Sequence, residues 1–231
     1  MTDLSDRVVV ITGSTGNLGQ ALVARLATAG ARLVLLDRGH NAAVTESERV
    51  IALGSLDLTD GAALAGALDA AKARFGRIDA LVATVGGFEG GSPVHETGWE
   101  VWERMIGANL QTAVASCQAA VPHLLEHGGR IVMVGARPAL AGVAGLAPYA
   151  AAKAAVVRLT ESLAQELLDR NVTANCVAPS IIDTPQNRAA MPNADHGRWV
   201  QPEDLAEVIL FLLSDGARSI SGATIPVYGR A

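Results

Sequence analysis

The strongest constraint on the fold is an alternation, along the whole chain, of strand-length apolar runs with helix-length amphipathic segments. The apolar runs predict strands at 7–13, 31–37, 49–57, 78–87, 129–136, 172–180 and 222–229. The segments between them predict helices at 18–30, 61–76, 99–128, 148–170 and 202–215. Such alternation is typical of a doubly wound parallel sheet with helices on both faces. We therefore expect residues 1–231 to form one α/β domain of the Rossmann type, with about seven parallel strands.

Two segments depart from this alternation. Residues 38–48 are polar and few, so we expect the crossover helix there to be missing or reduced. Residues 183–200 carry Pro, Asn, Asp and Gly without a clear period. They predict a mobile loop near the carboxyl ends of the strands, which would serve as a lid over a substrate.

Composition excludes several classes of protein. Half of the residues are hydrophobic and only 3% are aromatic, which suits strands that are buried on both faces. The net charge is −5 and no basic block occurs, so we expect no nucleic acid as a partner. The longest apolar region, 139–157, is interrupted by Gly, Pro and Lys, so we expect no membrane span.

The cysteines and histidines indicate neither a disulfide framework nor a metal site. Cys117 and Cys176 lie far apart in the sequence, and the five histidines form no pair with ligand spacing. The amino-terminal MTDLSDR does not resemble a signal peptide. These features predict a cytoplasmic protein with reduced thiols and no protein-bound metal.

A glycine-rich turn, TGSTGNLG at 12–19, follows the first expected strand and opens the first expected helix. Glycines there let the backbone turn tightly and approach a pyrophosphate, which the N–H groups and the dipole of the helix then attract. The residues expected to hold a dinucleotide in this turn are Gly13, Ser14, Thr15, Gly16, Asn17, Leu18 and Gly19.

The second expected strand ends in Asp37, 18 positions after Gly19. A carboxylate at this place accepts hydrogen bonds from both ribose hydroxyls and repels a 2′-phosphate, which favours NAD(H). The neighbouring Arg38 is able to accommodate a 2′-phosphate, so NADP(H) stays an alternative.

Taken in order, these motifs resemble the short-chain dehydrogenase/reductase family along almost the whole chain. The glycine turn, a Tyr-x-x-x-Lys pair at Tyr149 and Lys153, and the segments IGANL, VAPSIIDTP and SGATIPVYG match that family's pattern. The resemblance implies that Asn109 is a catalytic-site residue. It also implies cofactor contacts from Asp57, Leu58, Ala83, Gly86, Tyr149, Lys153, Pro179, Ile182 and Thr184, the last two at the nicotinamide end.

Two departures from the family pattern point to one branch. The family's Asn-Asn-Ala-Gly after the fourth strand is ATVG here, at 83–86, and its catalytic serine is replaced by Ala136. Both departures resemble the dihydropteridine reductase-like branch, as do the stretches VGGFEGG and DTPQNRAAMPNADHGRW. The resemblance to this branch implies NADH-dependent reduction of a quinonoid dihydropterin.

Tyr149 and Lys153 are separated by one helical turn, so their side chains share a face. A free tyrosine has a pKa of about 10, and a nearby positive charge favours its ionised form. We therefore expect Lys153 to lower the pKa of Tyr149, which then acts as a general acid in reduction or a base in oxidation. Asn109 is expected to hold a water that connects the lysine to solvent.

The absence of a hydroxyl at Ala136 bears on the acceptor. Reduction of a simple ketone builds negative charge on oxygen, and the loss of one donor typically costs about 10²–10³ in rate. In a conjugated imine or quinone that charge is delocalised, so the alanine should matter less. Phe88 is an aromatic that could stack on such a ring, and Met191 is a further candidate substrate contact.

Two alternatives stay open at this point: a carbonyl reductase or alcohol dehydrogenase similar to 3-oxoacyl reductases, and a dinucleotide-sensing module without turnover. For all three hypotheses, the family resemblance implies a homodimer or homotetramer acting on, or responding to, small molecules.

Overall fold

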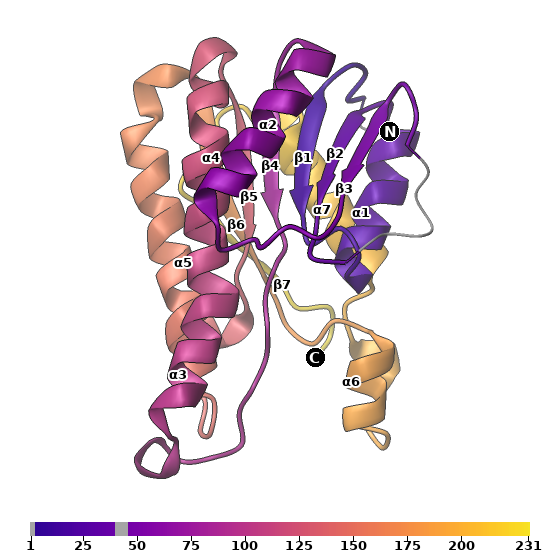
Figure 1. Cartoon of the computed structure of the whole chain (residues 1–231). Helices are drawn as coiled ribbons and strands as arrows, with labels where there is room; N and C mark the ends of the chain where they lie inside the picture. The colour runs from indigo at the N-terminus through magenta and orange to yellow at the C-terminus, as the bar shows by residue number, and fades with distance from the viewer. Residues whose placement is uncertain (1–2, 40–45) are drawn as a thin grey trace.

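A computed structural model of the chain describes residues 3–39 and 46–231 (Figure 1). Seven parallel strands form one sheet in the order β3-β2-β1-β4-β5-β6-β7. Their bounds are β1 Val8–Thr12, β2 Arg32–Leu36, β3 Val50–Leu53, β4 Ala80–Ala83, β5 Gly129–Val134, β6 Val172–Pro179 and β7 Thr224–Val227. This confirms the expected single α/β domain with a doubly wound sheet, although each strand is shorter than its apolar run.

Helices cover both faces of the sheet. Alternate residues of β1 divide between two cores: Val8 and Val10 pack on one face, Val9 and Ile11 on the other. The first core is closed by α2 Gly61–Phe75, α4 Thr112–His127 and α5 Ala147–Glu166, and the second by α1 Asn17–Thr28 and α7 Pro202–Leu213. Strands covered on both faces are apolar at most positions, which explains the nearly continuous hydrophobic runs.

The connectivity places the candidate site. From β1 the chain builds β2 and β3 toward one edge, then returns to β4 and builds toward the other. Between β1 and β4 the strand order therefore reverses, and open α/β sheets bind ligands at the carboxyl ends of the strands beside such a reversal. The glycine turn follows β1 at this point.

Two local expectations are corrected. The long helix expected at 99–128 is α3 Trp99–Ile106 and α4 joined by a π-helical turn, Gly107–Gln111. The loop expected at 183–200 contains a short helix, α6 Pro185–Ala190, and a 3₁₀ turn, η5 His196–Arg198. The Thr184 hydroxyl accepts a hydrogen bond from the N–H of Asn187 and Pro185 fixes the first helical φ, which together start α6.

The reduced crossover expected at 38–48 falls partly on residues outside the described ranges. No helix within the described ranges combines the length and apolar character needed to cross a membrane.

Candidate active site

The glycine turn fits the backbone of a dinucleotide. Gly13 has φ +82°, and a Cβ there would lie 2.7 Å from the Thr84 hydroxyl oxygen. A Cβ on Gly19 would overlap the carbonyl oxygen of Gly13. The N-cap of α1 is Gly16, which provides no side-chain acceptor for the first N–H groups of the helix. These N–H groups therefore remain suited to an anion such as a pyrophosphate.

Asp37 is held against the same turn. One of its carboxylate oxygens accepts hydrogen bonds from the backbone N–H and the hydroxyl of Thr15, both at 2.8 Å. The other accepts from the N–H of Gly39 at 3.3 Å. The sequence predicted that this carboxylate and the glycine turn serve the same dinucleotide. In the structure, hydrogen bonds to Thr15 connect the two directly.

Asp57 and Leu58, two of the expected cofactor contacts, lie in different surroundings. The N–H and then the hydroxyl of Thr59 lower the pKa of Asp57, with a smaller contribution from the charge of Arg38. Leu58 is 2% exposed and packs in the core, so its contact with a ligand stays a prediction.

Tyr149 and Lys153 lie one turn apart at the start of α5. Lys153 is 4% exposed, and its Nζ donates to the carbonyl oxygen of Val134 at 2.8 Å. Burial lowers the pKa of Lys153 to about 8. Burial also raises the pKa of Tyr149 to about 12, which corrects the expectation that the lysine lowers it. Desolvation of the phenol is the cause of this rise.

The π-helical turn positions Asn109. Its amide nitrogen donates to the carbonyl oxygens of Met105 at 2.9 Å and Gly87 at 3.0 Å, and its Oδ1 accepts from the N–H of Gly87 at 3.2 Å. A Cβ on Gly86 would lie 2.8 Å from that Oδ1 and 2.9 Å from the Nζ of Lys153. Because Gly86 has no side chain, the amide of Asn109 and the ammonium of Lys153 both lie close to its backbone. Whether a water joins them stays a prediction.

Comparison with known proteins shows the family to which this chain belongs. A family model described as enoyl-(acyl carrier protein) reductase matches residues 13–229. The cis-4-hydroxycyclohexanecarboxylate dehydrogenase of Sinomonas cyclohexanicum is 36% identical over 240 residues, which cover 97% of this chain and 96% of the relative. The chain belongs to the short-chain dehydrogenase/reductase family.

Further members support the coarse activity. The 3-oxoacyl-(acyl-carrier-protein) reductase of Escherichia coli K12 is 30% identical over 235 residues, covering 96% of each chain. The crystal structure of carveol dehydrogenase from Mycobacterium avium in complex with NAD matches with a TM-score of 0.88 at 27% identity, covering 99% of this chain and 98% of that one. The chain is therefore an NAD(P)-dependent oxidoreductase of this family.

The structure explains one departure from the family pattern. In ATVG at 83–86, Ala83 is buried at the end of β4, and the next residue carries the hydroxyl. The hydroxyl of Thr84 donates to the carbonyl oxygen of Thr12 at 2.8 Å and ties the end of β4 to the end of β1. This role of Thr84 was not predicted from the sequence, although a hydroxyl residue directly after a buried strand was the available signal.

The other departure, Ala136, is 4% exposed and lies in extended backbone just after β5. Its side chain offers no hydrogen bond to an acceptor. Phe88, in the loop after β4, is 68% exposed, and its ring meets that of Tyr149 edge to face at 5.0 Å between centroids. Phe88 is therefore close to the phenol. Its contact with a substrate stays a prediction.

The segment 183–200 lies beside the glycine turn. Ile182 pairs with Val200 and packs on the α1–α7 core, and Thr184 caps α6. Pro179 ends β6, and Met191, directly after α6, accepts a hydrogen bond at its carbonyl from the ring of His196. Trp199, directly after η5, is 6% exposed and packs in the interior.

The glycine turn also contacts this segment. The side-chain amide of Asn17 donates to Oε1 of Gln186 on α6 at 3.0 Å. Sequence reasoning assigned Asn17 to the cofactor but gave Gln186 no role, because its partner lies 169 positions away. Asp183 steadies the base of α6: Arg188 and then Gln201 lower its pKa strongly through hydrogen bonds to its carboxylate.

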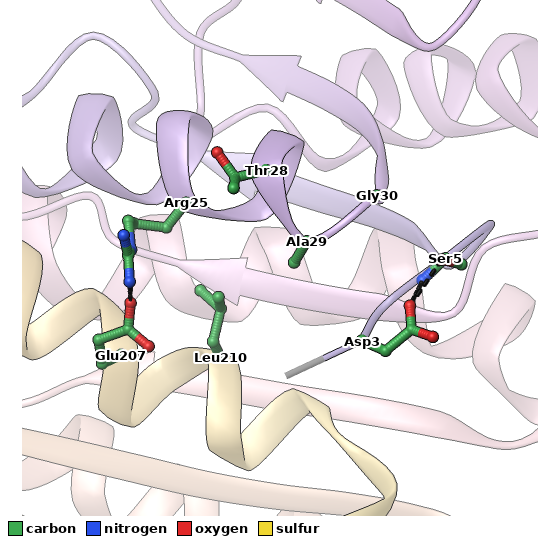
Figure 2. A pocket seen from close by; sticks show the side chains of 8 residues that line it. All are labelled: Asp3, Ser5, Arg25, Thr28, Ala29, Gly30, Glu207 and Leu210. Atoms are coloured by element: carbon green, nitrogen blue, oxygen red, sulfur yellow. Dashed lines mark hydrogen bonds and ion pairs between the residues drawn. The ribbon is translucent and has the colours of Figure 1, made fainter. Parts of the chain in front are cut away.

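Figure 2 shows a pocket elsewhere on the molecule, between α1 and α7. An ion pair between Arg25 and Glu207 lies on its wall. Asp3 and Ser5 precede β1, and Gly30 follows α1, so this pocket lies at the amino ends of the strands. It contains none of the residues that carry the chemistry. Within the described ranges, no group of three or more His, Cys, Asp or Glu residues is placed to hold a metal ion.

Proposed function

We propose that the protein reduces a planar conjugated acceptor, such as a quinone or a quinonoid dihydropterin, with NADH as the hydride source and Tyr149 as the proton donor. One combination of residues carries the proposal. A buried alanine, Ala136, stands at the position of the family's serine, and an exposed aromatic residue, Phe88, contacts the ring of Tyr149.

The titration of the pair favours reduction. With its pKa raised to about 12, Tyr149 holds its proton at neutral pH and is ready to donate it. Lys153, with a pKa of about 8, still carries its charge in most molecules at neutral pH. That charge stabilises the tyrosinate that forms when the proton leaves. The bound dinucleotide supplies the hydride, and the acceptor gains one hydride and one proton.

The acceptor class follows from the missing donor. At a ketone, negative charge concentrates on one oxygen, and an absent hydroxyl typically costs about 10²–10³ in rate. A quinonoid ring spreads that charge over several atoms, so Tyr149 alone supplies enough stabilisation. The exposed ring of Phe88 offers such an acceptor an apolar wall for stacking or edge contact.

Cofactor preference and assembly belong to the same proposal. The carboxylate of Asp37 at the ribose end favours NADH over NADPH, because it would repel a 2′-phosphate. We propose a homodimer or homotetramer, as is common in the family. The exposed or half-buried Ala151, Ala154 and Ala155 of α5 leave room for the close approach of a second copy.

A second candidate is the oxidation of secondary alcohols or reduction of simple ketones. It is favoured by the relatives, which include the cis-4-hydroxycyclohexanecarboxylate dehydrogenase and, at 36% identity over 244 residues, a meso-2,3-butanediol dehydrogenase from Serratia marcescens. On this hypothesis another group, or the substrate's own geometry, compensates for Ala136.

NADH oxidation with quinonoid dihydropterin, a set of quinones and a set of simple ketones separates the two candidates. Each acceptor is run with the wild type and with Tyr149→Phe, which keeps the ring and removes the proton. We expect tyrosine-dependent turnover of conjugated acceptors and weak turnover of ketones, with Tyr149→Phe slower by about 10²–10⁴. Tyrosine-dependent ketone turnover without activity on any conjugated acceptor would establish the second candidate instead.

A further inference from the structure

The loop between β5 and α5 is exposed, yet it carries no polar side chain after Arg137. From 138 to 148 it reads PALAGVAGLAP, in which no side chain contains a polar group. Leu140 and Val143 are 45% and 46% exposed, and all five residues 140–144 are exposed. Single exposed apolar side chains are common on proteins, whereas a contiguous apolar stretch marks a surface that binds something.

This stretch begins beside the position of the missing hydroxyl. Ala136 is followed by the 3₁₀ turn η3 Arg137–Ala139, which packs against α5. The N–H of Ala139 donates to the carbonyl oxygen of Ala136 at 2.9 Å. The N–H of Leu140 donates to the carbonyl oxygen of Arg137 at 3.1 Å. These hydrogen bonds fix Leu140 one turn of chain after Ala136.

The other end of the stretch lies against the loop that carries Phe88. The N–H of Gly91 donates to the carbonyl oxygen of Gly145 at 2.8 Å. A Cβ on Gly90 would overlap the side chain of Leu146, so the two loops are in close contact there. Figure 1 shows the chain after β4 leaving the sheet toward the start of α3, on the side away from α6.

Phe88 connects this stretch with Tyr149. Its loop contacts the stretch, and its own ring, which is 68% exposed, meets the ring of Tyr149 edge to face at 5.0 Å between centroids. We call the exposed side chains of Phe88, Leu140 and Val143 the apolar surface. The contacts between the two loops place this surface beside Tyr149.

The apolar surface carries no charge of its own. The one charged residue in the loop 85–94 is Glu89. Its carboxylate accepts hydrogen bonds from Arg104 of α3, from Nε at 3.0 Å and from Nη2 at 2.8 Å. This pairing neutralises the carboxylate on the α3 side of the loop, so a ligand on the apolar surface meets neither an unpaired acid nor an unpaired base from this loop.

We propose that the apolar surface binds an apolar substituent of the acceptor, an alkyl chain or a second aromatic ring, while the reducible ring faces Tyr149. Such a group gains free energy in proportion to the apolar area that leaves water, and these side chains offer that area without a polar side chain to desolvate. A second copy of the chain fits less well, because it would cover Phe88 and obstruct the approach to Tyr149. The inference rests on the proposed function, because it takes Tyr149 as the place of the reducible ring.

Two acceptors that share a ring test the proposal: 2-methyl-1,4-naphthoquinone and 2-hexyl-1,4-naphthoquinone. In the wild type we expect kcat/KM to be about tenfold higher for the hexyl compound, because several methylene groups leave water. In Leu140→Gln and in Val143→Thr this advantage should shrink by about three- to fivefold. An advantage that both variants keep in full would overturn the proposal.

Leu168→Gln is the matched control. Leu168 is 64% exposed in the 3₁₀ turn η4 Leu168–Arg170, which follows α5 at the other end of that helix from Tyr149. The variant makes the same exchange of side chains as Leu140→Gln and should keep the wild-type advantage of the hexyl compound. An equal loss in Leu168→Gln and Leu140→Gln would contradict the proposal, because the effect would not depend on the apolar surface.

Binding without turnover separates this proposal from the proposed function. Calorimetry with the NADH-loaded enzyme compares 4-ethylphenol with 4-hexylphenol, neither of which has a group that NADH reduces. We expect the hexyl compound to bind about tenfold more tightly to the wild type and to lose most of that gain in Leu140→Gln, but not in Leu168→Gln. This result supports the apolar surface even if no quinone is reduced, whereas an equal gain in all three proteins contradicts it, whatever the rates show.

Sedimentation velocity tests whether a second copy of the chain is the occupant instead. We expect the wild type and Leu140→Gln to form the same assembly, because the proposed ligand of this surface is a small molecule. A smaller assembly in Leu140→Gln, with the wild-type assembly kept in Leu168→Gln, would make this surface a subunit interface and would contradict the proposal.

Discussion

The candidate site has a cofactor half, formed by the glycine turn and Asp37, and a proposed acceptor half around Tyr149. Both halves lie at the carboxyl edge of the sheet, but they depend on different parts of the chain. In the cofactor half, main-chain geometry decides: a side chain on Gly13 or Gly19 would meet neighbouring atoms, and Asp37 is bonded to the turn itself. In the proposed acceptor half an exposed side chain decides: Phe88 lies in the loop after β4, with its ring against that of Tyr149. This difference predicts that substitutions in the acceptor half change the choice of acceptor and leave cofactor binding intact.

The largest expected effect breaks the cofactor half. Gly19→Ala places a methyl group against the carbonyl of Gly13 and the backbone of Ser14, so the turn must shift. We expect NADH to bind at least about tenfold more weakly, as measured by the fluorescence of the bound cofactor.

The control for this variant is Gly66→Ala. Gly66 is exposed on α2, and a Cβ there has no atom within 4 Å. It should leave NADH binding unchanged and stabilise the helix by about 0.5–1 kcal/mol. Normal NADH affinity in Gly19→Ala would show that the backbone of the turn is not the determinant we describe.

A second test concerns the buried ammonium of Lys153, one helical turn after Tyr149 on α5. Burial lowers its pKa from 10.5 to about 8, so between these values the unfolded chain binds more protons than the folded one. Lys153 therefore adds free energy of unfolding as the pH rises through that window, and costs stability below it. Burial raises the pKa of Cys117 to about 12 and that of Cys176 to about 11, which acts in the opposite direction.

The comparison of wild type with Lys153→Met isolates the lysine, because both proteins keep the thiols. Urea unfolding at about pH 7 and about pH 10 should show the wild type gaining a few kcal/mol relative to the variant. A difference between the two proteins that is the same at both pH values would contradict the buried, depressed lysine.

The smallest expected effect sharpens the acceptor half. Phe88→Leu keeps an apolar side chain but removes the aromatic ring beside Tyr149. Aromatic contacts are worth about 0.5–1.5 kcal/mol, so the KM for a conjugated acceptor should rise by a small factor while that for a simple ketone stays the same. Steady-state kinetics with one acceptor of each class measure this, and an equal rise in both would assign Phe88 to the loop's packing alone.

The contrast between the cofactor half and the acceptor half also explains which features could be predicted from the sequence. The glycine turn, Asp37 and the Tyr149–Lys153 pair are local motifs with fixed spacing, and each lies where it was expected. The strands are found because burial on both faces leaves a continuous apolar run. Their ends differ, because hydrogen-bonded pairing stops before the apolar run does.

The features that were missed depend on tertiary contacts or on short elements. Helix α6 has six residues, too few to show a period, and only the pair Thr184–Pro185 marks its start. The π-helical turn around Asn109, Gly107–Gln111, has five residues, too few for a pattern of its own to stand out within a long helical segment. The raised pKa of Tyr149 follows from burial, which no spacing in the sequence reveals.

The most direct test of the account is the ratio of kcat/KM for a conjugated quinone to that for a simple ketone, measured in the wild type and in Ala136→Ser. The account predicts that the new hydroxyl raises ketone reduction by about tenfold or more and leaves quinone reduction nearly unchanged, so that the ratio falls. An unchanged ratio, with both rates altered equally or neither altered, would contradict the claim that the alanine marks a site for delocalised charge.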